Sequence, residues 1–167
     1  MYSASSQLSP TSVANYFVNR ALSEGGTELT PMKLLKLVYL SHGWYLGLND
    51  AKPLIAEAVQ AWKFGPVITS VYHDFKSYNN SQITALAFDI ASASYSCVTD
   101  PSKVTFLDRI WEVYKGYSGL QLSTLTHEPG SPWDIVWNNY NGKNEHGAII
   151  PNNIIAEYYR NKANGNG

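Results

Sequence analysis

The sequence has a single cysteine, Cys97, in 167 residues. One thiol cannot form an internal disulfide, and it cannot supply the several thiolates of a structural zinc site. A chain without disulfides is typical of a reducing compartment, so we expect a cytoplasmic protein.

The chain also lacks an excess of charge of either sign, since 12 Lys and Arg residues stand against 13 Asp and Glu, for a net charge of −1. Nucleic-acid phosphates are bound by basic patches, so nucleic acid is not an expected partner. The apolar runs are interrupted by Lys33 and Lys36 and stay shorter than the roughly 18 residues of a membrane-spanning helix. With no signal-peptide pattern at the start, we expect no membrane partner.

Signature motifs of the common enzyme classes are missing from the sequence. It contains no GxGxxG, no P-loop, no HExxH, no CxxC pair and no GxSxG around a serine. The usual nucleotide-binding, zinc-protease, redox and hydrolase signatures are therefore excluded, and we expect no cofactor.

Aromatic residues, in contrast, are plentiful, with 5 Trp, 12 Tyr and 5 Phe. Trp and Tyr carry an apolar ring with a polar tip, and they are enriched where one protein binds another.

The stretch from Thr30 to Asn49 is the element around which we expect the chain to be organised. Thr30 is a good N-cap, and Pro31 suits the first helical position. Apolar residues surround the expected helix on all sides, which indicates a buried, central position. Gly43 and Gly47 lie four residues apart on one side, where a neighbouring element could approach closely.

The rest of the chain predicts further helices and few strands. Similar cap-and-proline starts occur at Ser9-Pro10, Asp100-Pro101 and Ser131-Pro132, the last with Asp134 in the capping-box position. Shorter helices are expected after Thr69 or Ser70, over 120–127 and after Pro151, and a strand over 57–64 that Gly65-Pro66 ends. The stretch 79–100 fits either a loop or a short element.

The predicted fold is therefore mainly α (α+β), a compact bundle of about six helices around a buried central helix, with one or two short strands. We expect a disordered segment over 1–8, a single domain over 9–160 and a flexible tail over 161–167.

Histidines supply the candidate catalytic residues. His42 falls on the apolar side of the central helix, so it is either a general base or metal ligand, or a core histidine bonded to a backbone carbonyl or a Tyr hydroxyl; we favour the core histidine. His73 and Asp74 are adjacent on a helix and point about 100° apart, which argues against a catalytic pair.

His127, next to Glu128, invites a base-and-nucleophile pairing with Ser131. The N-cap role explains Ser131 better, because a cap uses the oxygen that a nucleophile needs free. Lys33 and Lys36 share a face of the central helix and either extend to its exposed edge or meet an acidic partner. The aromatic residues of Trp62-Lys63-Phe64-Gly65-Pro66 are either core or rings presented to another protein at a rigid turn.

Five motifs follow one another along the chain: Thr30 to Leu34, His42 to Tyr45, Glu57 to Val67, Val71-Tyr72, and Ser131 to Trp133. Together they resemble the Panacea domain of SocA-type, phage-associated antitoxins, over a range from about Val13 to Tyr159. The resemblance implies a cytoplasmic antitoxin that neutralises, by direct contact, a toxin encoded beside it. Family toxins are of unrelated kinds, among them small-alarmone-synthetase-like enzymes, and some members deliver the toxin to a protease.

The resemblance also singles out particular residues. We expect four of them to bind the partner: Lys33, Lys63, Phe64 and Tyr72. We expect the remaining motif residues to be structural: His42, Trp44, Trp62, Gly65, Pro66, Ser131, Pro132 and Trp133.

Three functions stay open on the sequence. The first is an antitoxin that binds its toxin and performs no reaction, which we favour. The second is an adaptor that delivers the toxin to a protease, and the third is an enzyme, such as a hydrolase, that reverses the toxic product with His42, His73, Asp74 or His127 as acid and base.

Overall fold

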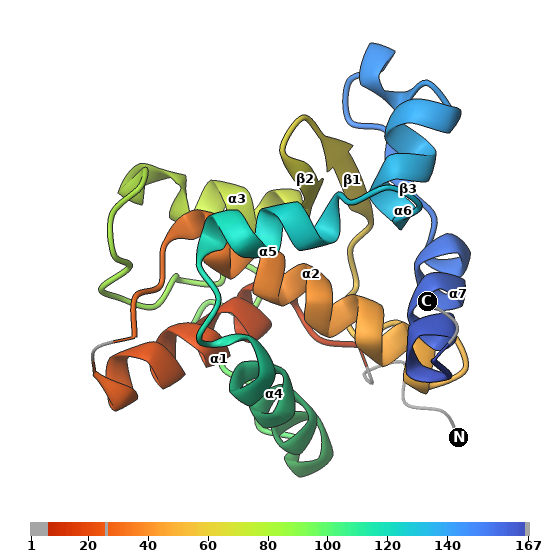
Figure 1. Ribbon diagram of the computed structural model, residues 1–167. Coiled ribbons are helices and arrows are strands. Elements are labelled where there is room, and N and C mark those ends of the chain that lie inside the picture. Colours follow the sequence, from red (N-terminus) through yellow and green to blue (C-terminus); the bar gives the residue numbers. More distant parts are fainter. Residues whose placement is uncertain (1–6, 26, 166–167) are drawn as a thin grey trace.

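The computed structural model describes residues 7–25 and 27–165, with α2 (Pro31–Leu48) crossing its middle (Figure 1). The Thr30 side chain accepts a hydrogen bond from the Lys33 amide and so caps α2 as predicted. Leu34, Leu37 and Val38 are fully buried. The expected central, buried helix is confirmed.

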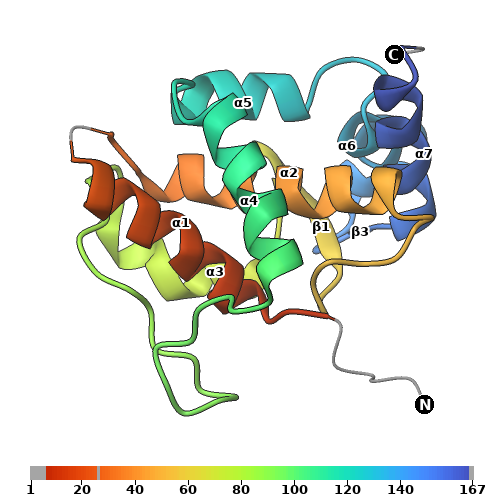
Figure 2. The same ribbon diagram turned by 90° about the horizontal axis from the view of Figure 1, so that it is seen from below.

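Shorter helices pack around α2, and α1 and α5 lie on opposite sides of it (Figure 2). The predicted N-caps Ser9, Asp100 and Ser131 each accept a backbone N–H in the first turn of their helix. The helices are α1 (Pro10–Glu24), α3 (Thr69–Phe75), α4 (Pro101–Tyr114), α5 (Gly119–Thr126), α6 (Pro132–Asp134) and α7 (Asn152–Ala163), with short helical turns η2 (Lys76–Tyr78), η3 (Ile135–Asn139) and η4 (Gly142–Asn144).

Two predicted caps differ from the structure in detail. The side chains of Thr69 and Ser70 do not cap α3; the Glu57 carboxylate accepts from both the Thr69 hydroxyl and the Ser70 amide instead. The Asp134 carboxylate accepts from the Gly130 amide at 2.8 Å and not from its own N-cap residue. In α3 the acceptor is therefore a residue outside the helix, and in α6 the expected acceptor bonds the residue before the N-cap.

A small antiparallel sheet has the strand order β2-β1-β3, with β1 (Val59–Trp62), β2 (Gly65–Val67) and β3 (Ile149–Ile150). The strand predicted over 57–64 is present as β1, but it ends at Trp62, and Gly65-Pro66 begin β2 instead of ending β1. Pro66 is tolerated there since β2 is an edge strand. Lys63 and Phe64 form the two-residue loop between β1 and β2, which projects from the body of the molecule in Figure 1.

The close approach expected at Gly43 and Gly47 is confirmed, and the neighbour is α7. A Cβ atom added to Gly43 would lie 2.5 Å from the Tyr159 ring, and one added to Gly47 would lie 2.7 Å from the Arg160 backbone nitrogen. The two glycines therefore let α7 pack directly against the second half of α2.

Residues 79–100 contain no helix or strand, although an isolated bridge joins Asp89 to Ser94. The buried Asn15 side chain of α1 holds this segment by donating to the carbonyls of Ala87 and Ser96 and accepting from the Ala87 amide. A polar residue on another element therefore fixes the loop.

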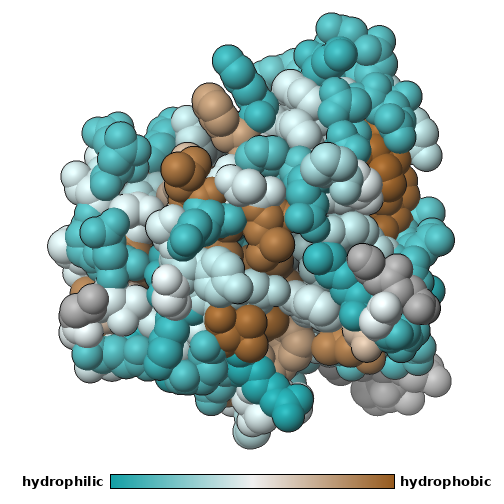
Figure 3. All heavy atoms as spheres, in the orientation of Figure 1, coloured by the Kyte–Doolittle hydropathy of each residue, from teal (hydrophilic) through white to brown (hydrophobic). Residues whose placement is uncertain are grey.

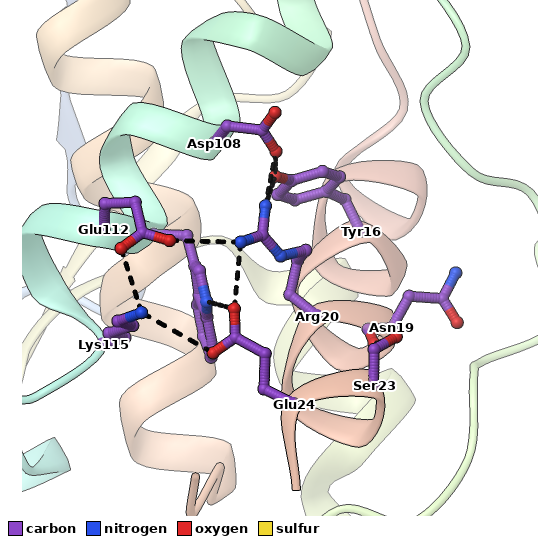
Figure 4. A network of polar contacts seen from close by, with 9 residues as sticks. Tyr16, Asn19, Arg20, Ser23, Glu24, Asp108, Glu112 and Lys115 are labelled. Atoms are coloured by element: carbon purple, nitrogen blue, oxygen red, sulfur yellow. Dashed lines mark hydrogen bonds and ion pairs between the residues drawn. The ribbon is translucent and has the colours of Figure 1, made fainter.

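Charged side chains hold α4 against α1, as Figure 4 shows. Arg20 lies between the two helices and pairs with Asp108 at 2.6 Å, Glu112 at 3.2 Å and Glu24 at 2.9 Å. Lys115 also pairs with Glu112, at 2.9 Å. Hydrogen bonds from Arg20 and then from Trp111 lower the pKa of the Glu24 carboxyl.

The predicted fold class, mainly α with a small sheet, is confirmed for the described residues. Residues 1–6 of the segment expected to be disordered lie outside the described residues, whereas Leu8 bridges Ile55. At the other end, α7 continues to Ala163, into the expected tail. None of the helices described is both long enough and apolar enough to span a bilayer.

Candidate functional site

A groove runs between the start of α2, the β1–β2 hairpin and the segment from α3 to Asn80, and we call it the hairpin groove. It encloses about 540 Å³. It is lined by Pro31, Met32, Leu35 and Lys36 of α2, Trp62, Lys63, Phe64 and Val67 of the hairpin, and Tyr72, Lys76, Asn79 and Asn80.

Surface hydrophobicity by itself does not identify the site. In the space-filling view of Figure 3, hydrophobic atoms form several separate patches among polar ones. The hairpin groove stands out because it combines a concave shape, a largely apolar lining and residues predicted to bind a partner: Lys63, Phe64 and Tyr72 all line it.

The aromatic side chains of the groove differ in exposure. The Trp62 and Tyr72 rings are half-buried and meet edge to face, with their centroids 4.9 Å apart. Phe64, in contrast, is 65% exposed at the tip of the hairpin, and its ring has the Lys63 ammonium 5.6 Å from its centroid. An exposed phenyl ring beside two partly buried rings is well placed to be covered by another molecule.

The backbone that carries Phe64 is held from two sides. The Ser123 hydroxyl of α5 donates to the Phe64 carbonyl at 2.8 Å. The Trp133 indole N–H donates to the Trp62 carbonyl at 2.6 Å. Trp133, predicted to be structural, thus fixes the hairpin, and Ser131 and Pro132 start the helix that carries it.

Lys36 brings a buried, titratable amine to the lining of the groove. Its side chain is 3% exposed, and its ammonium donates to the Pro66 carbonyl at 3.0 Å. Burial lowers the pKa of this ammonium to about 7. Gly65 makes room for it, since a Cβ atom there would lie 3.0 Å from Lys36 Nζ, and the φ of +122° at Gly65 also favours glycine.

The charged residues of the lining are all basic. Lys36, Lys63 and Lys76 come from three different elements, and no Asp or Glu is among the lining residues. The groove therefore complements a ligand that is apolar and negatively charged.

Lys33, which we expected to bind the partner, does not line this groove, and among the described residues it lies neither at an exposed edge nor in an ion pair with an acidic partner. Its side chain is 5% exposed, its ammonium donates to the Lys115 backbone carbonyl, and it lies 5.9 Å from the centroid of the Trp111 ring. Burial lowers its pKa. Lys33 and Lys36 are three positions apart on α2, yet their side chains diverge to opposite neighbours, because one reaches toward α4 and the other toward β2.

His42 is fully buried, as expected of a core histidine. Its Nε2 atom lies 3.0 Å from the Asn152 side-chain oxygen, so its hydrogen-bond partner is this amide and not the expected backbone carbonyl or Tyr hydroxyl. Its Nδ1 atom has no hydrogen-bond partner among the described residues. Burial lowers its pKa. Trp44 is also held inside the fold, where its indole N–H donates to the Tyr114 hydroxyl at 2.9 Å.

The remaining candidate catalytic residues are not brought together. Asp74 accepts a hydrogen bond from the Thr11 hydroxyl at 2.7 Å, and its neighbour His73 is exposed. The His127 ring packs edge to face on Trp133, and Ser131 is occupied as an N-cap. Within the described ranges, His, Cys, Asp and Glu side chains form no group of three that could hold a metal ion.

Sequence reasoning named four of the twelve residues that line the groove as partner-binding or structural motif residues: Trp62, Lys63, Phe64 and Tyr72. Met32, Lys36 and Lys76 also line it. The sequence singled out Lys36 as a lysine of the central helix, but its proximity to the hairpin and to Lys76 arises from packing between α2, the hairpin and η2, which no local pattern shows. The Gly65-Pro66 dipeptide after the predicted strand was the available signal for a turn here. The turn itself is Lys63-Phe64, and the second strand, β2, which begins at Gly65, was not predicted.

The comparisons with known proteins were consistent with one another. A family model described as "Antitoxin SocA-like, Panacea domain" matches residues 34–134. Antitoxin SocA of Caulobacter vibrioides (strain NA1000 / CB15N) is 29% identical over 153 residues, which cover 89% of this chain and 80% of that protein. No solved structure matches the chain.

Proposed function

Because the chain belongs to the SocA-like antitoxin family with a Panacea domain, we propose that it neutralises a cognate toxin by direct contact through the hairpin groove. Most of the groove lies within the residues that match the family model. Binding alone is enough for neutralisation if it denies the toxin its substrate, so the proposal requires no reaction by this chain.

The observation that carries the proposal is the exposed Phe64 on a rigid hairpin tip, beside Lys63 and Tyr72 in one groove. Aromatic side chains that become fully covered dominate the binding energy of many protein interfaces. A nanomolar complex requires about −12 kcal/mol, and such an interface usually covers about 800 Å² of each partner. The groove therefore supplies an anchor, and the surface around it must supply the remaining contact.

Replacement of Phe64 by alanine tests the proposal. We expect Phe64→Ala to weaken the complex with the toxin roughly tenfold or more while the thermal unfolding midpoint stays within about 2 °C of wild type, because the ring is mostly exposed and contributes little to the core. The toxin to be used is the protein encoded beside this gene, and the measurements are calorimetric binding and rescue of growth on co-expression.

Tyr95→Ala is the matched control, since Tyr95 is also an exposed aromatic residue, at 63%, but lies outside the groove. It should bind and rescue like wild type. Equal binding by wild type and Phe64→Ala would contradict the assignment of the groove, and separate migration of the two wild-type proteins on sizing would contradict direct neutralisation.

The other two functions make different predictions about the toxin. A protease adaptor lowers the amount of toxin in the cell, whereas an inhibitor leaves the amount unchanged, so toxin abundance with and without this protein distinguishes them. An enzyme that reverses the toxic product rescues growth without binding the toxin. His42→Ala addresses that case, although the contact of His42 with Asn152 gives it a structural role in the fold.

A further inference from the structure

We propose that the hairpin groove binds a toxin segment in which an acidic side chain lies next to apolar side chains, and that Lys36 is the counter-ion of this carboxylate. The inference rests on the proposed function and adds the chemistry of the segment that is recognised.

The position of Lys36 is the first argument. Its ammonium carries three N–H groups, and the described residues provide one hydrogen-bond partner, the Pro66 carbonyl at 3.0 Å. Among these residues no carboxylate lies within ion-pair distance of it. A carboxylate that enters the groove and reaches this buried amine favours its charged form, and the chain itself supplies no such partner among the described residues.

The charges around it are the second argument. Lys63 at the hairpin tip and Lys76 in η2 line the same groove, and the lining contains no acidic residue. Because the three basic residues lie on three elements, their charges are spread along the groove. A segment that runs along the groove can bring more than one acidic side chain to them, whereas a chain terminus brings a single carboxylate. We therefore assign the carboxylate to an Asp or Glu side chain.

The apolar residues of the lining indicate which side chains flank the acidic residue in the bound segment. Met32, Leu35 and Val67 are apolar, and Trp62 and Tyr72 present ring faces and edges. Such a surface gains from contact with aliphatic or aromatic side chains and gives no advantage to additional polar ones. The expected segment therefore contains large apolar side chains and at least one Asp or Glu.

Lys36→Met is the direct test, because methionine keeps the unbranched side chain up to the Cε position and removes the amine. We expect this variant to bind the product of the neighbouring gene at least about tenfold more weakly than wild type. Lys33→Met is the matched control: Lys33 is a second buried lysine of α2 whose ammonium also donates to a backbone carbonyl, but it does not line the groove. It should bind like wild type.

A double-mutant cycle excludes an indirect effect of the substitution on the groove. Overlapping peptides of the neighbouring gene product locate the bound segment, and each Asp or Glu in it is then changed to its amide in the full-length partner. At one of these positions, the change from the acid to its amide should weaken binding to wild type at least about fivefold. The same change should leave binding to Lys36→Met nearly unaltered.

The outcomes separate the two proposals. If wild type forms the complex and Lys36→Met binds equally well, or if every amide change is additive with Lys36→Met, the role of Lys36 is overturned and the antitoxin proposal stands. If wild type forms no complex, both are overturned. If Lys36→Met is unfolded by circular dichroism, Lys36→Gln is used in its place, and the same outcomes apply.

Discussion

Lys36 carries a titratable amine into the interior of the protein, where burial lowers the pKa of its ammonium to about 7. In the unfolded chain the same amine is in water and titrates near its ordinary value of 10.5. Between these two values the unfolded state binds more protons than the folded state. Stability therefore rises with pH across this window, by up to about 1.4 kcal/mol for each pH unit.

This pH dependence is measurable by chemical denaturation between pH 6 and pH 9. The unfolding free energy of wild type, taken relative to Lys36→Met, should increase as the pH rises above 7. Lys63→Met, which removes an exposed lysine from the same groove, should retain the wild-type increase. A constant difference between wild type and Lys36→Met over this range would show that the amine is not buried as described.

Single residues also show where prediction from sequence succeeded and failed. The burial of His42 follows from its position on an apolar helix face, which is a local property of the sequence. Its partner Asn152 and the divergent directions of Lys33 and Lys36 depend on which helix packs on which side, and no spacing along the chain contains that information.

At the scale of elements, the contact between α2 and α7 depends on Gly47. A methyl group there would lie 2.7 Å from the Arg160 nitrogen and 2.8 Å from the Tyr159 carbonyl carbon, and backbone cannot move as easily as a side chain. We expect Gly47→Ala to destabilise the protein by about 1–3 kcal/mol, even though alanine favours helix.

Gly116→Ala is the control for this prediction, because a Cβ atom at Gly116 has open space around it. It should be neutral or slightly stabilising. Both variants are measured by urea denaturation, and an equal effect of the two changes would mean that α7 does not pack as closely as described.

Elements whose start is set by neighbouring residues were predictable, and elements set by distant residues were not. The cap-and-proline pairs at Ser9, Thr30, Asp100 and Ser131 identified four helix starts. The two-residue strand β3 forms only because β1 lies beside it, and the loop of 79–100 takes its conformation from Asn15 on α1. Such long-range partners leave little trace in local composition.

At the scale of the whole molecule, α2 contacts elements from both halves of the chain, including α1, α5 and α7. Because these helices all pack on α2, no part of the molecule keeps its hydrophobic core without this helix. We therefore expect the protein to unfold in a single cooperative transition, as small single domains usually do.

Two probes test this expectation. Far-ultraviolet circular dichroism reports helices, and tryptophan fluorescence reports the surroundings of residues such as Trp62, Trp111 and Trp133. The two denaturation curves should superimpose. Distinct midpoints would instead indicate that the chain is divided into parts of different stability.

Pro66 has a consequence for how a partner can be recognised. It lies in the middle of the three-residue edge strand β2, it has no N–H to donate, and its carbonyl is already taken by Lys36. A visiting polypeptide therefore cannot extend the sheet by main-chain pairing along this edge. At this edge, side chains alone must distinguish one binding partner from another. A few surface substitutions are therefore enough to redirect the same scaffold to a different target without any change in its backbone.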